Sequence, residues 1–246
     1  MSPATKQATR LDEMMEDASA ALVAGEYFHS EQLAAKAMQI AFGREDWGTV
    51  ARIAMPLQEA RRQRRLMAID ANRIFVFDKN PPSGEEPLEP GCYVICAPCV
   101  AADARRINEA GRDQRVPVIA LACEPKTQLG LLPVAVVGLT TIRAKMKPPH
   151  AFTPKWCLQA IEALTQSALE TFDPGRAVHR QVEDLVEKVM TLPDSELLHQ
   201  KLAAVAHNAA QVCGSESRPT RAAASASKPR RGKAGHKGPR RVKRDE

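Results

Sequence analysis

The spacing of apolar side chains over the first 70 residues is typical of amphipathic helices. Apolar residues recur every three or four positions, with polar residues between them. This periodicity predicts helices over residues 11–24, 27–41 and 47–66. Gly25 is expected to end the first helix, and Asp46 is expected to cap the amino end of the third.

The pattern changes in the middle of the chain to short apolar runs that are typical of buried strands. These runs cover residues 73–78, 92–98, 116–123 and 133–139, and a helical segment over 100–114 separates the second run from the third. An apolar run, a helix and another apolar run are characteristic of a βαβ unit with parallel strands. The sequence therefore predicts a small parallel sheet.

Helical periodicity returns after residue 155. Helices are predicted over 155–172, from Asp173-Pro174 onward, and over 192–213, where Gly214 is expected to end the last one. The fold class is thus a helix-rich α/β protein. Four segments are expected: helices over 10–68, an α/β domain over 71–144, a C-terminal helical region over 155–213 and a tail over 214–246.

The first two predicted helices resemble a tetratricopeptide repeat over residues 18–41. The resemblance rests on the Gly25-x-Tyr27 turn and on small residues at Ala34 and Ala37 of the second helix, whereas Ser30 stands where that family usually has Ala. The resemblance implies two closely packed antiparallel helices and a surface that binds a protein partner. About one repeat is visible, and arrays of such repeats normally need about three.

Most of the net positive charge lies at the C-terminal end. Residues 214–246 hold eleven of the 35 Lys and Arg residues and three of the 29 Asp and Glu residues, a net charge of +8. The rest holds 24 basic and 26 acidic residues, a net charge of −2. The tail has one Val and no aromatic residue, so it is expected to be disordered.

The tail resembles the basic tails of linker histones and their bacterial counterparts in composition. The resemblance implies nucleic-acid binding without sequence preference, through cations that neutralise phosphates. The residues expected to bind are Lys228, Arg230, Arg231, Lys233, Lys237, Arg240, Arg241, Lys243 and Arg244. A passive, solubilising tail is the alternative, and the arginine run 61–65 is interpreted as a solvated helix end that could extend the basic surface.

Neither a secretory signal nor a membrane span is predicted. The first 18 residues contain no apolar run, and the longest uncharged run, 127–142, is short for a span and contains Pro133. A soluble cytoplasmic protein without a membrane partner is expected. Its six cysteines are then expected to be thiols or ligands rather than disulfides.

Cys92, Cys96 and Cys99 follow the spacing C-x3-C-x2-C, which resembles the cluster motif of radical-SAM enzymes. Their setting differs, because the first two lie in an apolar run and Pro98 precedes the third where an aromatic residue is usual. A zinc site of Cys96, Cys99 and Cys123 and a reactive Cys99 at a helix amino end are further alternatives. Buried core thiols are the preferred interpretation, and no metal or cofactor is predicted.

The chain contains no Walker A, dinucleotide-binding, nucleophile-elbow or HExxH motif. If all strands are parallel, a ligand would bind at the edge where they end. The candidate residues at that edge are Cys99, Asp103, Glu124, Thr140 and Thr141. Ordinary cap, turn and loop roles are the alternative for these residues.

These patterns favour a non-catalytic protein with a helical protein-binding surface and a nucleic-acid-binding tail. The alternative is an enzyme or small-ligand-binding α/β domain that uses the strand edge, with Cys99 as nucleophile or ligand.

Overall fold

A computed structural model describes residues 3–216 of the chain. The helices are α1 (Pro3–Val23), α2 (Tyr27–Phe42), α3 (Trp47–Asp70), α4 (Ala101–Asp113), α5 (Pro154–Glu170), α6 (Val178–Thr191) and α7 (Glu196–Glu216). The strands are β1 (Ile74–Phe77), β2 (Gly91–Cys96), β3 (Val118–Cys123), β4 (Leu132–Val137) and β5 (Thr141–Met146). The predicted fold class is confirmed. The tail residues expected to bind nucleic acid lie outside the described residues.

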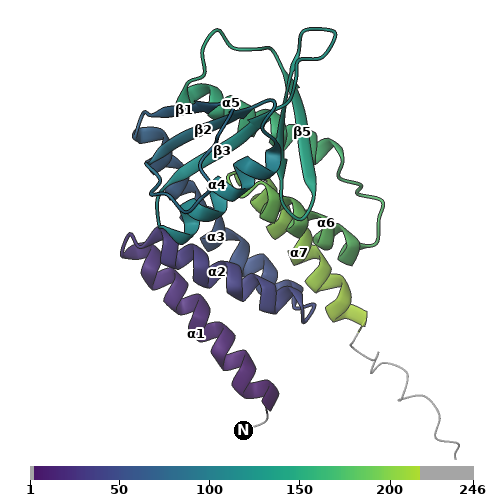
Figure 1. The fold of residues 1–246 in the computed structure, drawn as a ribbon. Coiled ribbons are helices and arrows are strands. Elements are labelled where there is room, and N and C mark those ends of the chain that lie inside the picture. The colour runs from purple at the N-terminus through teal and green to yellow at the C-terminus, as the bar shows by residue number, and fades with distance from the viewer. Residues whose placement is uncertain (1–2, 217–246) are drawn as a thin grey trace, which may run out of the picture.

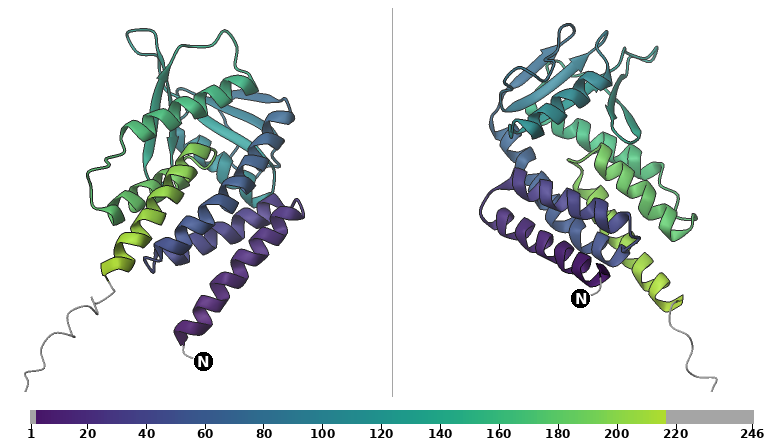
Figure 2. Two further views of the ribbon diagram at one scale, coloured as in Figure 1. Left: turned by 180° about the vertical axis from the view of Figure 1, so that it is seen from behind. Right: turned by 60° about the horizontal axis from the view of Figure 1, so that its bottom comes forward.

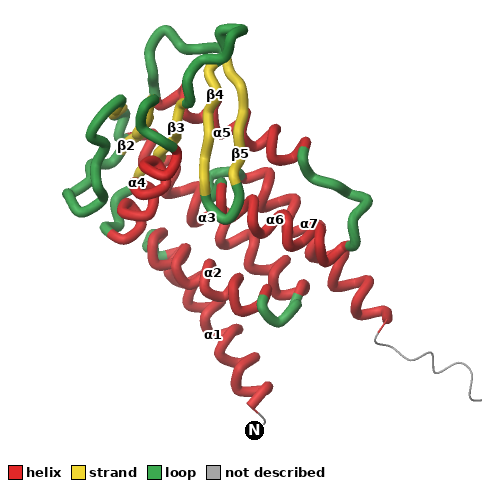
Figure 3. Tube along the Cα trace, turned by 45° about the vertical axis from the view of Figure 1, so that its right-hand side comes forward, coloured by secondary structure: helices red, strands yellow, loops and turns green. Residues whose placement is uncertain are grey.

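The five strands form one mixed sheet in the order β1-β2-β3-β4-β5. The predicted parallel pairing is confirmed for β1, β2 and β3 and is wrong for β4, which runs antiparallel to β3. Figure 3 shows β4 and β5 side by side as a hairpin. The reason is the short connection 124–131, because a crossover between parallel strands needs a dozen or more residues. The prediction missed β5, which pairs antiparallel with β4 and alternates exposed and buried residues.

Each face of the sheet is covered by helices, as the apolar runs of its central strands require. On β2, Tyr93 and Ile95 belong to the apolar cluster with α4, and Cys92 and Val94 belong to the core shared with α3 and α5. Figure 1 shows α4 and α5 on opposite faces of the sheet. The Asn108 side chain of α4 bonds to both the backbone N–H and the carbonyl of Ala120 at 2.9 Å. It occupies hydrogen bonds that a strand partner would otherwise make, and so it fixes α4 against β3.

Helices α1, α2, α3, α6 and α7 form a second layer next to the sheet, and α3 also contacts β2 and β3. Within this layer α1 packs on α2, α2 on α3, α3 on α7, and α7 on α6 (Figure 2). The C-terminal helices thus pack both on the sheet, through α5, and on the N-terminal helices, through α7. The described chain begins and ends on this side, away from the sheet (Figures 1 and 2).

The hairpin of α1 and α2 is closely packed. Ala18, Ala34 and Ala37 are buried at its interface. Ser30 is also fully buried, and its hydroxyl donates to the carbonyl of Ala18 at 2.8 Å. The predicted helical N-terminal region is confirmed, whereas the tetratricopeptide assignment stays a prediction.

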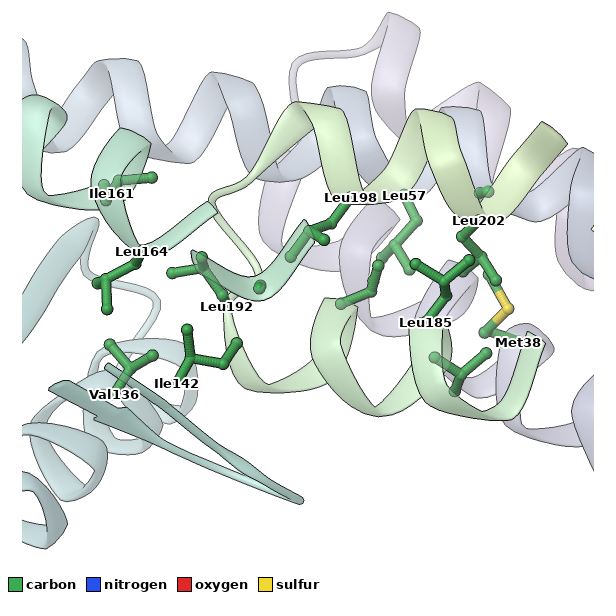
Figure 4. Packing of buried hydrophobic residues seen from close by; sticks show 14 of the residues in the cluster. Met38, Leu57, Val136, Ile142, Ile161, Leu164, Leu185, Leu192, Leu198 and Leu202 are labelled. Carbon is green, nitrogen blue, oxygen red and sulfur yellow. The ribbon is translucent and has the colours of Figure 1, made fainter. Parts of the chain in front are cut away.

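One continuous apolar cluster runs from α1 to α7 and includes one face of the sheet. Figure 4 shows Leu57 of α3 beside Leu198 and Leu202 of α7. In the same view Leu192, at the end of α6, lies near Leu164 of α5, which faces the sheet. The helical layer and the sheet are therefore joined by shared buried side chains.

Two of the predicted helix ends differ from the structure. The Asp173 side chain accepts from the Gly175 N–H in a turn, so α6 begins at Val178 instead of at the predicted Asp173-Pro174. The last helix continues through Gly214 to Glu216. The predicted cap is confirmed for α3, where Asp46 accepts from the Thr49 N–H at 3.0 Å.

Candidate functional site

The structure separates the residues predicted to share one strand edge. Cys99 and Glu124 follow the carboxyl ends of β2 and β3, and Asp103 lies in the first turn of α4. Because β4 is antiparallel to β3, Thr140 and Thr141 lie at the opposite edge. The expectation of one cluster is therefore wrong for the two threonines.

Three of these residues make bonds that stabilise the fold. The Asp103 carboxylate accepts from the Val100 N–H at 2.9 Å at the start of α4 and pairs with Arg106. Glu124 pairs with Arg143 of β5 at 2.8 Å. The Thr140 backbone N–H donates to the Thr191 hydroxyl of α6 at 3.1 Å.

The cysteines lie in two different layers. Cys96 and Cys123 are register partners on neighbouring strands, and with Cys92 and Cys157 they belong to the core beneath α5. Cys99 packs with the other cluster, on the α4 side of the sheet. The three thiols considered for zinc therefore do not converge, and residues 3–216 contain no group of three His, Cys, Asp or Glu side chains arranged to hold a metal ion.

Three of the four core thiols, Cys96, Cys123 and Cys157, favour the protonated form, whereas the hydrogen bond with Cys157 lowers the pKa of Cys92. Burial raises the pKa of Cys123 to about 12 and also raises the pKa of Cys96. The hydrogen bond with Cys92, together with burial, raises the pKa of Cys157. Since the thiolate is the reactive and metal-binding form, these three thiols act as core side chains.

The arginine run of α3 lies largely inside the protein, which corrects its interpretation as a solvated helix end. Arg61 Nε donates to Glu31 of α2 at 2.9 Å, and Arg64 pairs with the other oxygen of the same carboxylate. Arg65 pairs with Glu196 and donates to the carbonyl of Asp194 at 2.6 Å. The run therefore ties α3 to α2 and to the start of α7.

The charges of Arg61 and Arg64 also set the ionisation of Glu31. Burial opposes ionisation of this carboxyl, but the two guanidinium groups outweigh burial and lower its pKa to about 2. Glu31 is thus a carboxylate at every ordinary pH.

His199 of α7 completes this buried group. Its Nε2 lies 3.1 Å from Arg61 Nη1, which can only donate, and its Nδ1 lies 2.7 Å from the carbonyl of Ser195. The ring is therefore neutral, with its proton on Nδ1. Burial, followed by the neighbouring Arg61 charge, lowers the pKa of His199 to about 3.

A cavity of about 450 Å³ lies where α4 meets the helical layer. We refer to it as the arginine cavity because three arginines line it: Arg61 of α3, Arg112 of α4 and Arg115 in the turn after α4. Two carboxylates, Glu31 and Asp113, complete its charged lining.

Arg112 and Arg115 were not among the site residues predicted from the sequence. The available signal was the stretch "RDQR", in which two arginines surround the end of a predicted helix. These arginines meet α2 and α3 only because of the way α4 packs over the sheet. Local periodicity in the sequence does not contain that information.

Within residues 3–216 no helix combines the length and the apolar character needed to cross a membrane. Comparison of the chain with protein-family models, with curated proteins and with solved structures gives no significant match.

Proposed function

We propose that this protein is a non-catalytic interaction protein that binds nucleic acid through the basic segment 214–246 without sequence preference. The supporting observation is the division of charge, a net of +8 in that segment against −2 in the rest of the chain. An extended cationic segment neutralises phosphates and releases their counterions, which provides affinity without base contacts.

The fold is consistent with nucleic-acid binding by the basic segment alone, without the arginines of α3. The arginine run that could have extended the basic surface is used internally, because Arg61, Arg64 and Arg65 pair with Glu31 and Glu196. The segment also follows α7, whose end lies on the side away from the sheet (Figure 1).

The experiment measures fluorescence anisotropy of labelled duplex DNA and of labelled RNA with the full-length protein over a range of salt concentrations. A variant with all nine Lys and Arg residues of 228–244 replaced by Gln should lose the binding. For the unmodified chain the slope of log affinity against log salt should reach a magnitude of up to roughly eight on duplex DNA.

Two control proteins make the result specific. A chain in which residues 217–246 are shuffled keeps the charge and should bind as well as the natural order, since no base sequence is read. A body variant with Arg143→Gln and Arg180→Gln, both exposed on the fold, should also bind normally. The proposal is contradicted if the neutralised variant still binds nucleic acid. It is also contradicted if the shuffled chain no longer binds.

The helical layer is the proposed protein-binding surface. Support comes from α1, which packs mainly on α2 and leaves residues such as Glu16 exposed on its outer side. A photoreactive residue at Glu16 in the full chain should crosslink a protein partner, and one at the exposed Leu129 of the β3–β4 connection should not. Equal products from both positions would exclude a specific surface on α1.

The alternative with Cys99 as nucleophile or ligand has less support from this geometry. Asp103 and Glu124, the acidic residues closest to that edge in sequence, are held in ion pairs with Arg106 and Arg143. Under the main proposal, Cys99→Ser should leave nucleic-acid binding unchanged.

A further inference from the structure

The arginine cavity combines buried and exposed cations around one space. Arg61 is almost completely buried, whereas Arg112 and Arg115 are exposed at the cavity wall. The carboxylate of Glu31, opposite α4, is already shared by Arg61 and Arg64. It is therefore unavailable to neutralise the two arginines of the α4 end.

Within the described part of the chain, Arg112 and Arg115 form no ion pair, although the neighbouring Arg105 and Arg106 on the same helix each form one. This excess of positive charge also affects Arg61. Burial and the Arg112 charge lower the pKa of Arg61, whereas Glu31 raises it. The remaining acidic residue, Asp113, lies exposed on the rim. Like charges around a partly enclosed space favour a bound anion.

The backbone holds Arg115 in a conformation that arginine rarely adopts. Its φ is +55°, in the left-handed region, and it follows the last turn of α4 at a position where glycine is usual. The Arg115 N–H donates to the carbonyl of Arg112, and the Val116 N–H donates to the carbonyl of Gly111. The turn at Arg115, three residues after Arg112, therefore places a second arginine on the same cavity.

The wall opposite α4 is mixed, with Glu31 and Gln32 of α2 beside three apolar side chains. Phe28 and Ala35 of α2 and Met190 of α6 line it, and the Arg64 guanidinium lies 4.4 Å from the centre of the Phe28 ring. A volume of about 450 Å³ is larger than inorganic phosphate needs and falls within the range of small-molecule sites. The lining thus offers an anionic group two arginines and offers an organic group the apolar side chains of Phe28, Ala35 and Met190.

We propose that the arginine cavity binds a small organic phosphomonoester, with its phosphate between Arg112 and Arg115 and its organic part against Phe28 and Met190. Arginine provides planar, multiple donors that match phosphate oxygens. This site is separate from the basic segment 214–246 and does not depend on its function.

The test is isothermal titration calorimetry on the full chain with three probes: adenosine 5′-monophosphate, glycerol 3-phosphate and inorganic phosphate. Adenosine and glycerol are the uncharged comparisons. The esters should bind more tightly than inorganic phosphate, and the uncharged compounds should not bind. Arg112→Gln and Arg115→Gln should each weaken ester binding about tenfold or more, as expected when a charge-assisted hydrogen bond is lost.

Arg180→Gln is the matched control, because it removes one exposed arginine from α6 and should leave ester binding unchanged. Arg115→Lys should retain part of the affinity, since it keeps the charge but not the planar donors. Thermal melts of each variant verify that the fold is intact.

Ester binding that is equal in Arg112→Gln, Arg115→Gln and the unmodified chain would overturn the proposal. So would the absence of binding by all three phosphate probes at millimolar concentration. The variant neutralised over residues 228–244 separates the two proposals: it should keep ester binding while losing nucleic acid, and Arg112→Gln should do the reverse.

Discussion

Glu31 and His199 contact opposite sides of one buried guanidinium, that of Arg61. Arg61 also donates to the carbonyl of Val189 at 3.2 Å, so helices α2, α3, α6 and α7 meet at this side chain. A buried charge is tolerated only when its partners remain in place, because removal of one partner leaves the other uncompensated. The stability of the helical layer should therefore depend strongly on these few residues.

Glu31→Gln tests that dependence. It should lower the free energy of unfolding by about 3–5 kcal/mol, because Arg61 and Arg64 would keep buried charges without their carboxylate. Urea denaturation followed by circular dichroism measures the change. Glu59→Gln is the control: it breaks a half-exposed pair with Arg62 on the same helix and should have little effect.

Stability should fall with pH below about 6.5 because of His199. Its pKa in the folded protein, about 3, lies below the ordinary 6.5, so the unfolded chain binds a proton that the fold excludes. The contribution of His199 to the free energy of unfolding is fully present above pH 6.5. It is lost as the pH falls toward 3, at about 1.4 kcal/mol per pH unit. Protonation of Glu31 adds a similar loss of stability, but only as the pH falls from about 4.5 to about 2.

His199→Gln should remove the contribution of His199 to the pH dependence between 6.5 and 4.5, and the opposite contribution of Asp194, whose pKa burial raises, should remain. A glutamine amide can accept from Arg61 and donate to the Ser195 carbonyl as the neutral ring does, but it does not titrate. Urea denaturation at several pH values measures the slope. His179→Gln, at an exposed position of α6, should retain it, and an unchanged slope in His199→Gln would contradict the assignment.

Arg115→Gly should stabilise the protein by about 1 kcal/mol, because glycine adopts the left-handed conformation without the Cβ clash. Arg115→Ala removes the same charge but keeps the Cβ, and it should not stabilise. Thermal unfolding of both variants distinguishes backbone strain from charge repulsion. Equal melting temperatures for Gly and Ala would show that the turn is not strained.

At the scale of elements, α4 approaches β3 closely through Gly111. A Cβ at this position would lie 2.3 Å from Val118 Cγ2 and 3.1 Å from the carbonyl oxygen of Val116. The same contact holds the carboxyl end of α4, and with it Arg112, against the sheet.

Gly111→Ala should destabilise the fold by about 1–3 kcal/mol, because α4 must move away from the sheet to accept the methyl group. Gly48→Ala in α3 is the matched control, since a Cβ there would meet its neighbours only at 3.7 Å or more. That substitution should be neutral or slightly stabilising, because alanine favours the helix. Chemical denaturation should therefore show a loss of stability for Gly111→Ala and no loss for Gly48→Ala.

The elements themselves were largely predictable, and their arrangement was less so. Helical periodicity placed α2 over 27–41 where the structure has Tyr27–Phe42, because one side of that helix is buried throughout. The direction of β4 was missed although the short connection before it contained the signal. The missed strand β5 has only two buried residues, Ile142 and Ala144, so its apolar content is too low for a buried run.

For the candidate residues at the strand edge, too, the sequence predicted positions better than contacts. Asp103 and Glu124 were placed correctly after their strands, but their partners Arg106 and Arg143 were not predicted. A carboxylate that caps a helix and one that binds a ligand have the same local sequence. Only the neighbours supplied by the fold distinguish the two roles.

For the whole molecule, the continuous apolar cluster predicts one cooperative unfolding transition. The chain has two tryptophans, Trp47 at the start of α3 and Trp156 in α5 beside the sheet, and both are buried. Trp156→Phe leaves Trp47 of α3 as the single tryptophan, and Trp47→Phe leaves Trp156 of α5. Within each variant the fluorescence and circular-dichroism transitions in urea should coincide, since shared side chains couple the parts.

A fluorescence midpoint that separates from the circular-dichroism midpoint in either variant would contradict this expectation. It would instead support independent unfolding of the helical segment 10–68, which contains Trp47, and of the C-terminal helical region 155–213, which contains Trp156. Comparison within one variant avoids the error of comparing proteins of different stability.

The packing of α7 against α3 has a consequence for the order in which the protein can be made. Leu57 of α3 meets Leu198 and Leu202, which are synthesised more than a hundred residues later (Figure 4). Until α7 leaves the ribosome, α3 exposes an apolar side that a nascent chain must shield or a chaperone must cover. The N-terminal helices are therefore made first but reach their final packing among the last.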